Sequence, residues 1–237
     1  MQNIIICDKQ YSIETRVDNL LVILNQIKTT QNSSLAYRSG CRSGVCGSCA
    51  VTVNGAEKLA CKTHIKDGDI ITPLKNSEVI KDLVVDISTQ ERFLKKAKAS
   101  LDTKSDTVIT SQDEKNIDVE SNCILCNSCF SSCPIYEVNQ DFIGPFALTR
   151  NYRYIDDKKE SENGVKDKID VVQKNGIWDC TLCGNCNMVC PAHIDIKGDI
   201  MKLRNKSAQF GYNDPNFTNN NIGFDTNLDF GFNPNGF

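Results

Sequence analysis

The sequence lacks long hydrophobic runs, has only two histidines and one tryptophan, and carries no excess of positive charge. Its longest apolar stretch, LLVIL at residues 20–24, is far shorter than the ~20 residues needed to span a bilayer. Membrane contact is therefore expected only through a partner. The 27 lysines and arginines are balanced by 30 acids, and no basic stripe alternates with aromatic residues. We therefore expect no nucleic-acid partner.

The N-terminus, MQNIIICDKQYS, has no basic residue before its short apolar run, so we expect no signal peptide. This matters for the thirteen cysteines, because a disulfide framework is typical of exported and much shorter chains. The count is also odd. We therefore interpret the cysteines as thiolate ligands for metal in a reducing compartment.

The cysteines fall into three groups of four, with Cys7 left over as an expected buried strand residue. Each iron-sulfur cluster of the [2Fe-2S] or [4Fe-4S] type takes four thiolates, so the count fits three clusters. The groups are Cys41, Cys46, Cys49 and Cys61; Cys123, Cys126, Cys129 and Cys133; and Cys180, Cys183, Cys186 and Cys190.

The first group has the spacing Cys-x4-Cys-x2-Cys followed by a more distant cysteine, which is the plant-type [2Fe-2S] arrangement. Four residues between Cys41 and Cys46 allow a loop to wrap one side of a flat two-iron unit. Gly40, Gly44 and Gly47 allow positive φ and close backbone approach, so amide N–H groups can point at sulfur. The sequence therefore predicts a [2Fe-2S] site here.

The second and third groups both read Cys-x2-Cys-x2-Cys-x3-Cys-Pro, the bacterial run in which the fourth cysteine binds the other cluster. The ligand sets are therefore expected to cross. Zinc is the alternative for any Cys-x2-Cys pair, although x3-Cys-Pro after three cysteines is seldom a zinc pattern. By the crossing rule, one [4Fe-4S] site uses Cys123, Cys126, Cys129 and Cys190, and the other uses Cys133, Cys180, Cys183 and Cys186.

The pattern of apolar residues predicts an α+β chain that begins with a small mixed sheet crossed by one helix, the β-grasp ferredoxin arrangement. Asp18 is expected to cap that helix, and a second helix is expected to begin at Val79 and lead out of the domain. The expected strands lie at 3–7, 11–17, 50–53, near 58–62 and at 69–72, and the first helix at 19–28.

We expect three regions: a β-grasp domain at 1–88, an all-α ferredoxin-like domain at 89–206 that includes a polar linker at 100–118, and an Asn/Phe/Gly-rich tail at 207–237. The charged stretch 156–170 is expected to be a solvated helix face or loop. For the tail, two interpretations stay open. It is either disordered or lays anchors into a partner's grooves: Phe210, Phe217, Phe224, Phe230 and Phe232.

The order and spacing of several motifs resemble those of the iron-sulfur subunit of succinate dehydrogenase or fumarate reductase. The resemblance covers residues 1 to about 206 and rests on RSGCRSGVCGSC, SNCILCNSCFSSCPIYEVN, DFIGPFALT and VCPAHIDI. It implies an oxidoreductase subunit with no catalytic residue of its own, which passes single electrons between the FAD of a flavoprotein partner and a membrane-side acceptor such as quinone. It also implies a position at the cytoplasmic face of the inner membrane, held there by partner subunits.

The sequence departs from the family at Cys183. The resemblance implies a [3Fe-4S] third cluster held by Cys133, Cys180 and Cys186, with a non-cysteine residue at position 183. A fourth thiolate would retain the fourth iron and lower the reduction potential. Some relatives with this extra cysteine dock a cysteine-rich membrane-associated subunit in place of haem-bearing membrane anchors.

Two further departures bear on quinone binding, because a Trp and a His that line the quinone pocket in many members are replaced by Val138 and Thr181. Other interpretations remain open. The same electron-transfer chain could serve a thiol-linked fumarate reductase or a glycolate-type dehydrogenase, or the protein could be a zinc-binding interaction module. Trp178 is expected to pack over the third cluster, His64 and His193 to be structural, and Lys197, Lys202, Arg204 and Lys206 to form a solvated helix end or a surface for anions.

Overall fold

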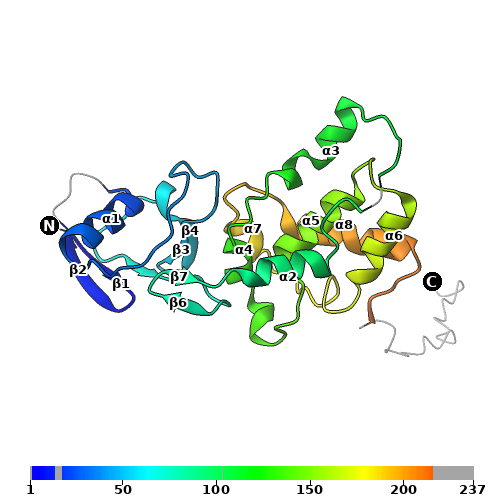
Figure 1. The fold of residues 1–237 in the computed structure, drawn as a ribbon. Helices are drawn as coiled ribbons and strands as arrows, with labels where there is room; N and C mark the ends of the chain where they lie inside the picture. The colour runs from blue at the N-terminus through cyan, green and yellow to red at the C-terminus, as the bar shows by residue number, and fades with distance from the viewer. Residues whose placement is uncertain (1, 14–17, 103, 216–237) are drawn as a thin grey trace, which may run out of the picture.

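A computed structural model describes residues 2–13, 18–102 and 104–215, and shows two parts with separate hydrophobic cores. Figure 1 shows the strands of the first part on the left and helices α2 to α8 of the second on the right. Helices and strands are thus segregated along the chain, as the expected α+β class requires.

The first part contains a five-stranded mixed sheet with strand order β2-β1-β5-β3-β4. Strands β1 and β5 pair in parallel, whereas the other neighbours are antiparallel. This sheet, crossed by helix α1, confirms the predicted β-grasp arrangement. The bounds are β1 (Gln2–Ile6), β2 (Lys9–Ile13), α1 (Leu20–Thr30), β3 (Ala50–Val53), β4 (Ala56–Leu59) and β5 (Ile70–Thr72).

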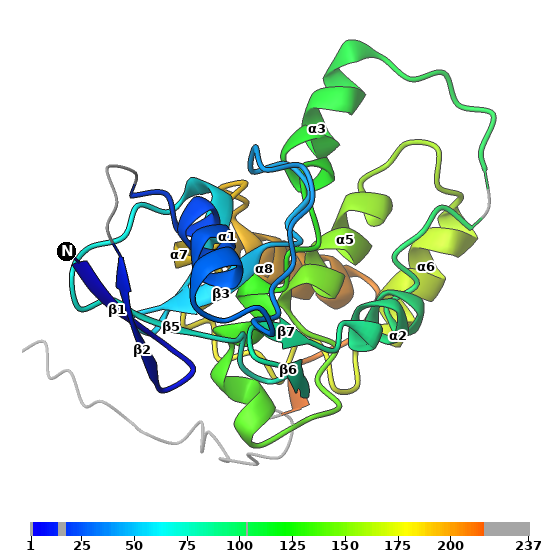
Figure 2. The same cartoon turned by 60° about the vertical axis from the view of Figure 1, so that its left-hand side comes forward.

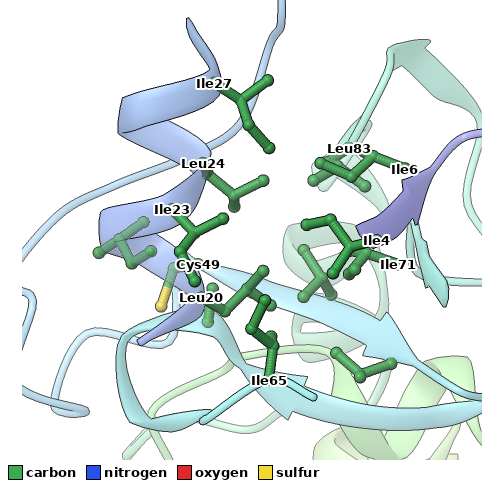
Figure 3. Close-up of a cluster of buried hydrophobic side chains, with 14 of the residues drawn as sticks. Ile4, Ile6, Leu20, Ile23, Leu24, Ile27, Cys49, Ile65, Ile71 and Leu83 are labelled. Carbon is green, nitrogen blue, oxygen red and sulfur yellow. The ribbon is translucent and has the colours of Figure 1, made fainter. Parts of the chain in front are cut away.

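Helix α1 lays its apolar side chains on the sheet, as Figure 3 shows for Leu24 and Ile27 opposite Ile6. Its N-cap is Asn19, whose side-chain oxygen accepts hydrogen bonds from the backbone N–H groups of residues 21 and 22. The prediction of Asp18 as the cap was wrong. Asp18 instead pairs with His64, with 2.8 Å between Oδ1 and Nδ1.

The prediction of a helix from Val79 was wrong for its first residues, because these residues form a small hairpin and the helix begins only after it. Strands β6 (Val79–Lys81) and β7 (Val84–Val85) pair with each other, and α2 (Ser88–Lys96) follows. Asp82 takes a left-handed φ of +46° at the turn. Its carboxylate accepts a hydrogen bond from the backbone N–H of Ala36, which ties the hairpin to the first core.

The second part is helical, and Figure 2 shows α3 standing away from the packed helices. A capping box between Thr110 and Asp113 starts α3 inside the segment expected to be a polar linker. The apolar segment around FIGP leads into α5. The remaining bounds are α3 (Ser111–Ser121), α4 (Ser128–Ser131), the 3-10 turn Pro134–Glu137, α5 (Pro145–Ile155), α6 (Glu162–Val171), α7 (Asn185–Met188) and α8 (Ile196–Gln209).

The charged stretch 156–170 is more than a solvated surface. Lys168 and Glu160 have fully buried side chains, with 2.8 Å between the ammonium and Oε2. Where the tail was expected to begin, α8 runs to Gln209, and Tyr212 donates a hydrogen bond to the Asp170 carboxylate. The four phenylalanines proposed as anchors after Phe210 lie outside the described residues. In the parts of the chain that the structure describes, no helix combines the length and apolarity needed to cross a membrane.

Candidate cluster sites

The first cysteine group lies at one end of the β3–β4 hairpin. Cys49 immediately precedes β3, and Cys61 lies in the short 3-10 turn Ala60–Lys62 after β4. The antiparallel pairing of Ala50 with Leu59 therefore brings these two cysteines together, and the Ala60 N–H donates to the Cys49 carbonyl at 3.0 Å.

The other two cysteines of this group lie in an exposed loop whose backbone N–H groups point at sulfur. Cys41 Sγ accepts hydrogen bonds from the N–H groups of Ser43, Val45 and Cys46 at 3.3–3.4 Å. Hydrogen bonds from Ser43, followed by that from Val45, lower the pKa of the Cys41 thiol to about 5. The loop therefore favours a thiolate, the form that binds metal.

Glycine is required in this loop for two different reasons. Gly44 and Gly47 have φ values of +84° and +69°, in the region that L side chains rarely adopt. Gly40 has no positive φ, but a Cβ there would lie 2.8 Å from Cys46 Sγ. The predicted close approach is thus present at Gly40 and Gly47, and the predicted positive φ at Gly44 and Gly47.

Cys49 is buried, and burial raises the pKa of its thiol to about 11. A thiolate in such surroundings needs a nearby positive charge to offset the lost hydration, which bound iron would supply. The four sulfur donors, the amide groups aimed at Cys41 and the space left by glycine all fit a [2Fe-2S] cluster.

The second site joins two segments that are far apart in sequence. Cys123, Cys126, Cys129 and Cys190 line one small enclosed cavity, together with apolar side chains such as Phe146. Cys190 belongs to the second of the two cysteine runs, so the structure brings the crossing ligand to the three cysteines that the crossing rule predicts.

The third predicted site consists of the other crossing set. The pKa of the Cys133 thiol is raised to about 11, first by burial and then by the charges of Cys180 and Cys183. The pKa of the Cys186 thiol is raised to about 12 by burial and by the charges of Cys180, Cys133 and Cys183. Helix α7, which contains Cys186, lies against α4, and Asn185 of α7 donates a hydrogen bond to the carbonyl oxygen of Ser132, next to Cys133, at 3.4 Å. Cys183 is exposed.

The two cysteine runs share an unusual backbone as well as a spacing. Leu125 and Asn127 have φ values of +52° and +65°, and the corresponding Leu182 and Gly184 have +56° and +85°. Left-handed leucine is uncommon, so its recurrence shows that both loops wrap in the same way. The repeat in sequence is therefore also a repeat in structure.

No three His, Cys, Asp or Glu side chains converge on a single-ion site anywhere in residues 2–13, 18–102 and 104–215. A tetrahedral zinc ion holds its sulfurs at about 2.3 Å. An iron-sulfur cluster, in contrast, spreads its four thiolates over several iron atoms.

The three groups follow one another through the molecule. A Cβ on Gly47 of the first loop would lie 2.7 Å from Cys126 Cβ, so the first and second sites are in contact. The pKa of the Cys129 thiol is raised well above its usual range by burial first, and then by neighbouring thiols that include Cys186 of the third site. The second site therefore lies next to both others.

The other residues that were singled out in the sequence lie in several different places. Cys7 is half buried and has a φ of +46° in the β1–β2 turn, so its prediction as a buried strand residue was wrong. His193 is exposed, and its backbone N–H donates to the Cys190 carbonyl. Val138 and Thr181, at the positions matched to the quinone-pocket residues, are both exposed.

The prediction that Arg204 belongs to a solvated helix end or a surface for anions was wrong. Its guanidinium donates hydrogen bonds to the carbonyl oxygens of Ile177 and Cys180, the latter at 2.7 Å, and lies 5.4 Å from the centre of the Trp178 ring. It therefore holds the backbone that carries a third-site cysteine instead of facing solvent. Lys206 likewise pairs with Asp156 at 2.5 Å.

Comparison with known proteins agrees with this arrangement. Residues 6–92 match the 2Fe-2S iron-sulfur cluster binding domain family, and residues 120–194 match the 4Fe-4S dicluster domain family. The fumarate reductase iron-sulfur subunit of Mycobacterium tuberculosis is 36% identical over 197 residues, which cover 78% of this chain and 79% of that protein. The chain belongs to the family of succinate dehydrogenase and fumarate reductase iron-sulfur subunits.

Other members of this family show similar agreement. The fumarate reductase iron-sulfur subunit of Escherichia coli O157:H7 is 34% identical over 81% of this chain and 82% of its own. The 8-methylmenaquinol:fumarate reductase iron-sulfur subunit of Wolinella succinogenes is 36% identical over 82% of this chain and 65% of its own. The fold matches a chain of the Mycobacterium smegmatis Sdh1 complex in the apo form, with a TM-score of 0.78, 23% identity and coverage of 90% and 97%.

The protein is therefore an iron-sulfur electron-transfer subunit of an oxidoreductase, with a 2Fe-2S domain followed by a 4Fe-4S dicluster domain. The predicted α+β fold class, the [2Fe-2S] and [4Fe-4S] cofactors and the resemblance to this family are confirmed.

Proposed function

We propose that this subunit relays single electrons between the FAD of a flavoprotein subunit and a membrane-side acceptor, with succinate and fumarate interconverted in the flavoprotein. The contiguity of the three thiol groups carries the proposal, because Gly47 contacts Cys126 and Cys129 lies near Cys186. We assign the ligands as Cys41, Cys46, Cys49 and Cys61; Cys123, Cys126, Cys129 and Cys190; and Cys133, Cys180, Cys183 and Cys186.

When bound, the three clusters supply centres that each accept and release one electron. The chain's own residues set where those centres lie and how their charge is stabilised. N–H groups of Ser43 and Val45 donate to Cys41 Sγ and stabilise negative charge in the first loop. Around the second site, Phe146 and the other cavity residues exclude water and keep the surroundings apolar.

The two ends of this series are the parts of the site that reach the surface. Cys41 and Cys46 are exposed, and Val45 between them is 66% exposed. At the other end, Val138 and Met188 are 85% and 87% exposed. Val138 directly follows the 3-10 turn that begins after Cys133, and Met188 is the last residue of α7, which contains Cys186. We propose that the flavoprotein covers the first end and the membrane-side partner covers the second.

We propose that the third site holds a [4Fe-4S] cluster, because Cys183 supplies a fourth thiolate beside Cys133, Cys180 and Cys186. Its exposure leaves this site open to a partner. That partner is a membrane anchor or a cysteine-rich membrane-associated subunit, at the cytoplasmic face of the inner membrane. Val138 offers no polar group to a quinone, which favours a partner that takes electrons directly.

The domain limits of 1–88, 89–206 and 207–237 remain part of this proposal. The two cores support it: Leu83 and Val85 belong to the first, whereas Phe93 and Ala97 of the segment that follows belong to the second.

Low-temperature EPR of the anaerobically purified, mildly oxidised complex, with iron counted alongside, tests the proposal. Two [4Fe-4S] clusters and one [2Fe-2S] cluster give about ten iron atoms per subunit. They give no strong oxidised signal, since oxidised [4Fe-4S] is silent and oxidised [3Fe-4S] is paramagnetic. A strong oxidised signal with about nine iron atoms would assign Cys183 as a bystander. A colourless protein with zinc in place of iron would refute the electron-relay function.

A further inference from the structure

Gly47 of the first cluster loop lies directly against the second cluster loop. Gly47 lies between Cys46 and Cys49 with a φ of +69°. A Cβ added there would lie 2.7 Å from Cys126 Cβ, 2.9 Å from Cys126 Cα and 3.0 Å from the Ile124 carbonyl oxygen. Two of these atoms are backbone and the third is fixed to it, so none can move aside as a flexible side chain can.

The loop that faces Gly47 is also held by a side chain of α2. Gln90, in the first turn of α2, donates a hydrogen bond from Nε2 to the Leu125 carbonyl oxygen at 2.6 Å. Leu125 has a φ of +52°, and it directly precedes Cys126. This bond fixes the backbone next to Cys126, so a shift of that backbone away from a larger residue at position 47 would strain or break it.

A second set of contacts joins the two parts nearby. The side-chain amide nitrogen of Asn76 lies 2.9, 3.1 and 3.2 Å from the carbonyl oxygens of Phe130, Ser131 and Cys133. The Ser131 hydroxyl donates to Glu57 and accepts from the Lys75 N–H, at 2.7 and 2.8 Å. These bonds hold the two parts in a fixed position relative to each other, so the Gly47 contact lies in a rigid interface between them.

Gly44 provides the natural comparison. It lies in the same loop and has a similar φ of +84°. A Cβ there would approach only the flexible side chain of Lys62, with Cε nearest at 2.7 Å. Alanine at position 44 therefore introduces the same backbone strain as alanine at position 47, but it leaves the distance between the two cluster loops unchanged.

We propose that Gly47 is a positioning residue that sets the closest approach of the first and second clusters, and with it the rate of electron exchange between them. The inference rests on the ligand sets of the proposed function, and it adds the place at which an electron passes between the first and second clusters. In each exchange one electron leaves the reduced centre and reduces the oxidised one, with no bond made or broken. Such transfer weakens steeply with separation, so a side chain that forces the loops apart slows it.

The test compares Gly47→Ala with Gly44→Ala in the full-length subunit within its assembled complex. Iron content is measured first, and then the microwave-power saturation of the [2Fe-2S] EPR signal after full reduction. A reduced neighbouring cluster speeds the relaxation of that signal, and the effect falls steeply with distance. We expect both variants to keep about ten iron atoms. Gly44→Ala should saturate as the unchanged protein does, and Gly47→Ala at several-fold lower power.

Equal saturation of the two variants, with iron content retained, would overturn the proposal. If Gly47→Ala loses its iron, Gln90→Ala decides instead, because it frees the Leu125 carbonyl and leaves the first loop intact. Easier saturation in that variant supports the positioning role, whereas unchanged saturation overturns it. Failure of the proposed function is a separate result, since the unchanged complex would then lack the iron or the two interacting signals.

Discussion

The ammonium group of Lys168 lies 2.8 Å from Glu160 Oε2, and both side chains are fully buried. The Lys168 ammonium also lies 3.0 Å from Oδ2 of Asp102, in the segment that follows α2. Hydrogen bonding to Lys168 lowers the pKa of Asp102. One buried cation thus joins Glu160, eight residues before it, with Asp102, 66 residues before it.

Lys168→Met should destabilise the protein by about 3 kcal/mol, because it leaves the Glu160 carboxylate buried without its cation. Thermal unfolding of the loaded subunit should show a Tm lower by roughly 5–10 °C. Lys166→Met on the same helix is the control, since Lys166 is exposed. Adding Glu160→Gln to Lys168→Met should recover part of the loss. Equal Tm values for Lys166→Met and Lys168→Met would contradict this account.

Asp199 should make stability depend on pH in the neutral range. Burial, and then the charge of Glu120, raise the pKa of the Asp199 carboxyl from 3.8 to about 7. The folded protein therefore binds this proton more tightly than the unfolded chain does. The resulting stability is fully present below pH 3.8 and is lost as the pH rises through about 7.

Asp199→Asn should remove this dependence and still accept the hydrogen bond that Thr149 donates to Oδ2 at 2.9 Å. Between pH 6 and pH 8 the unchanged protein should lose on the order of 1 kcal/mol more stability than the variant. The measurement is Tm at both pH values, read against Asp195→Asn, whose carboxyl has a lowered pKa. Parallel Tm curves for the unchanged protein and Asp199→Asn would count against a raised Asp199 pKa.

Cys183→Ser should remove one iron atom from the third site, because three thiolates hold a [3Fe-4S] cluster. Iron should fall from about ten to about nine per subunit, and a strong EPR signal should appear in the oxidised sample. Cys7→Ser is the matched control, since Cys7 lies in the β1–β2 turn away from all three groups. A variant with unchanged iron and no new signal would show that Cys183 is not a ligand.

Arg204→Lys should weaken retention of the third cluster although it keeps the positive charge. Lysine cannot reproduce the hydrogen bonds that the guanidinium donates to the Ile177 and Cys180 carbonyls. Each buried carbonyl left unpaired costs about 1–3 kcal/mol. Iron content should be followed during incubation with a chelator, with Lys197→Met as the control. Equal rates of iron loss in Arg204→Lys and the unchanged protein would refute this role.

The cysteine groups could be predicted because their spacing is local and their chemistry is restrictive. The crossing of Cys190 to the cavity of Cys123, Cys126 and Cys129 followed from a rule about the Cys-Pro position, and the structure brings these residues together. The sheet and helix α1 followed from β-branched strands and apolar residues at helical spacing.

Other features could not be read from local patterns. The segment VIKDLVV has apolar residues that suit either a strand or a helix, and the turn at Asp82 decides for a hairpin. Arg204 depends on carbonyl partners 24 to 27 residues away, and Lys168 on carboxylates 8 and 66 residues away. A charged side chain in a polar stretch gives no signal of such partners, so solvent exposure was the default expectation.

The similar loops around Leu125 and Leu182 have a consequence for how the protein is made. With the assigned ligands, the last cysteine of each loop binds the cluster that the other loop holds. Neither four-iron site is therefore complete until both loops have left the ribosome. The third site lacks its last ligand until Cys186 is made, and the second until Cys190, so both clusters are inserted late in synthesis. A nascent chain that ends before Asp179 can receive its [2Fe-2S] cluster, but it has no complete ligand set for either of the others.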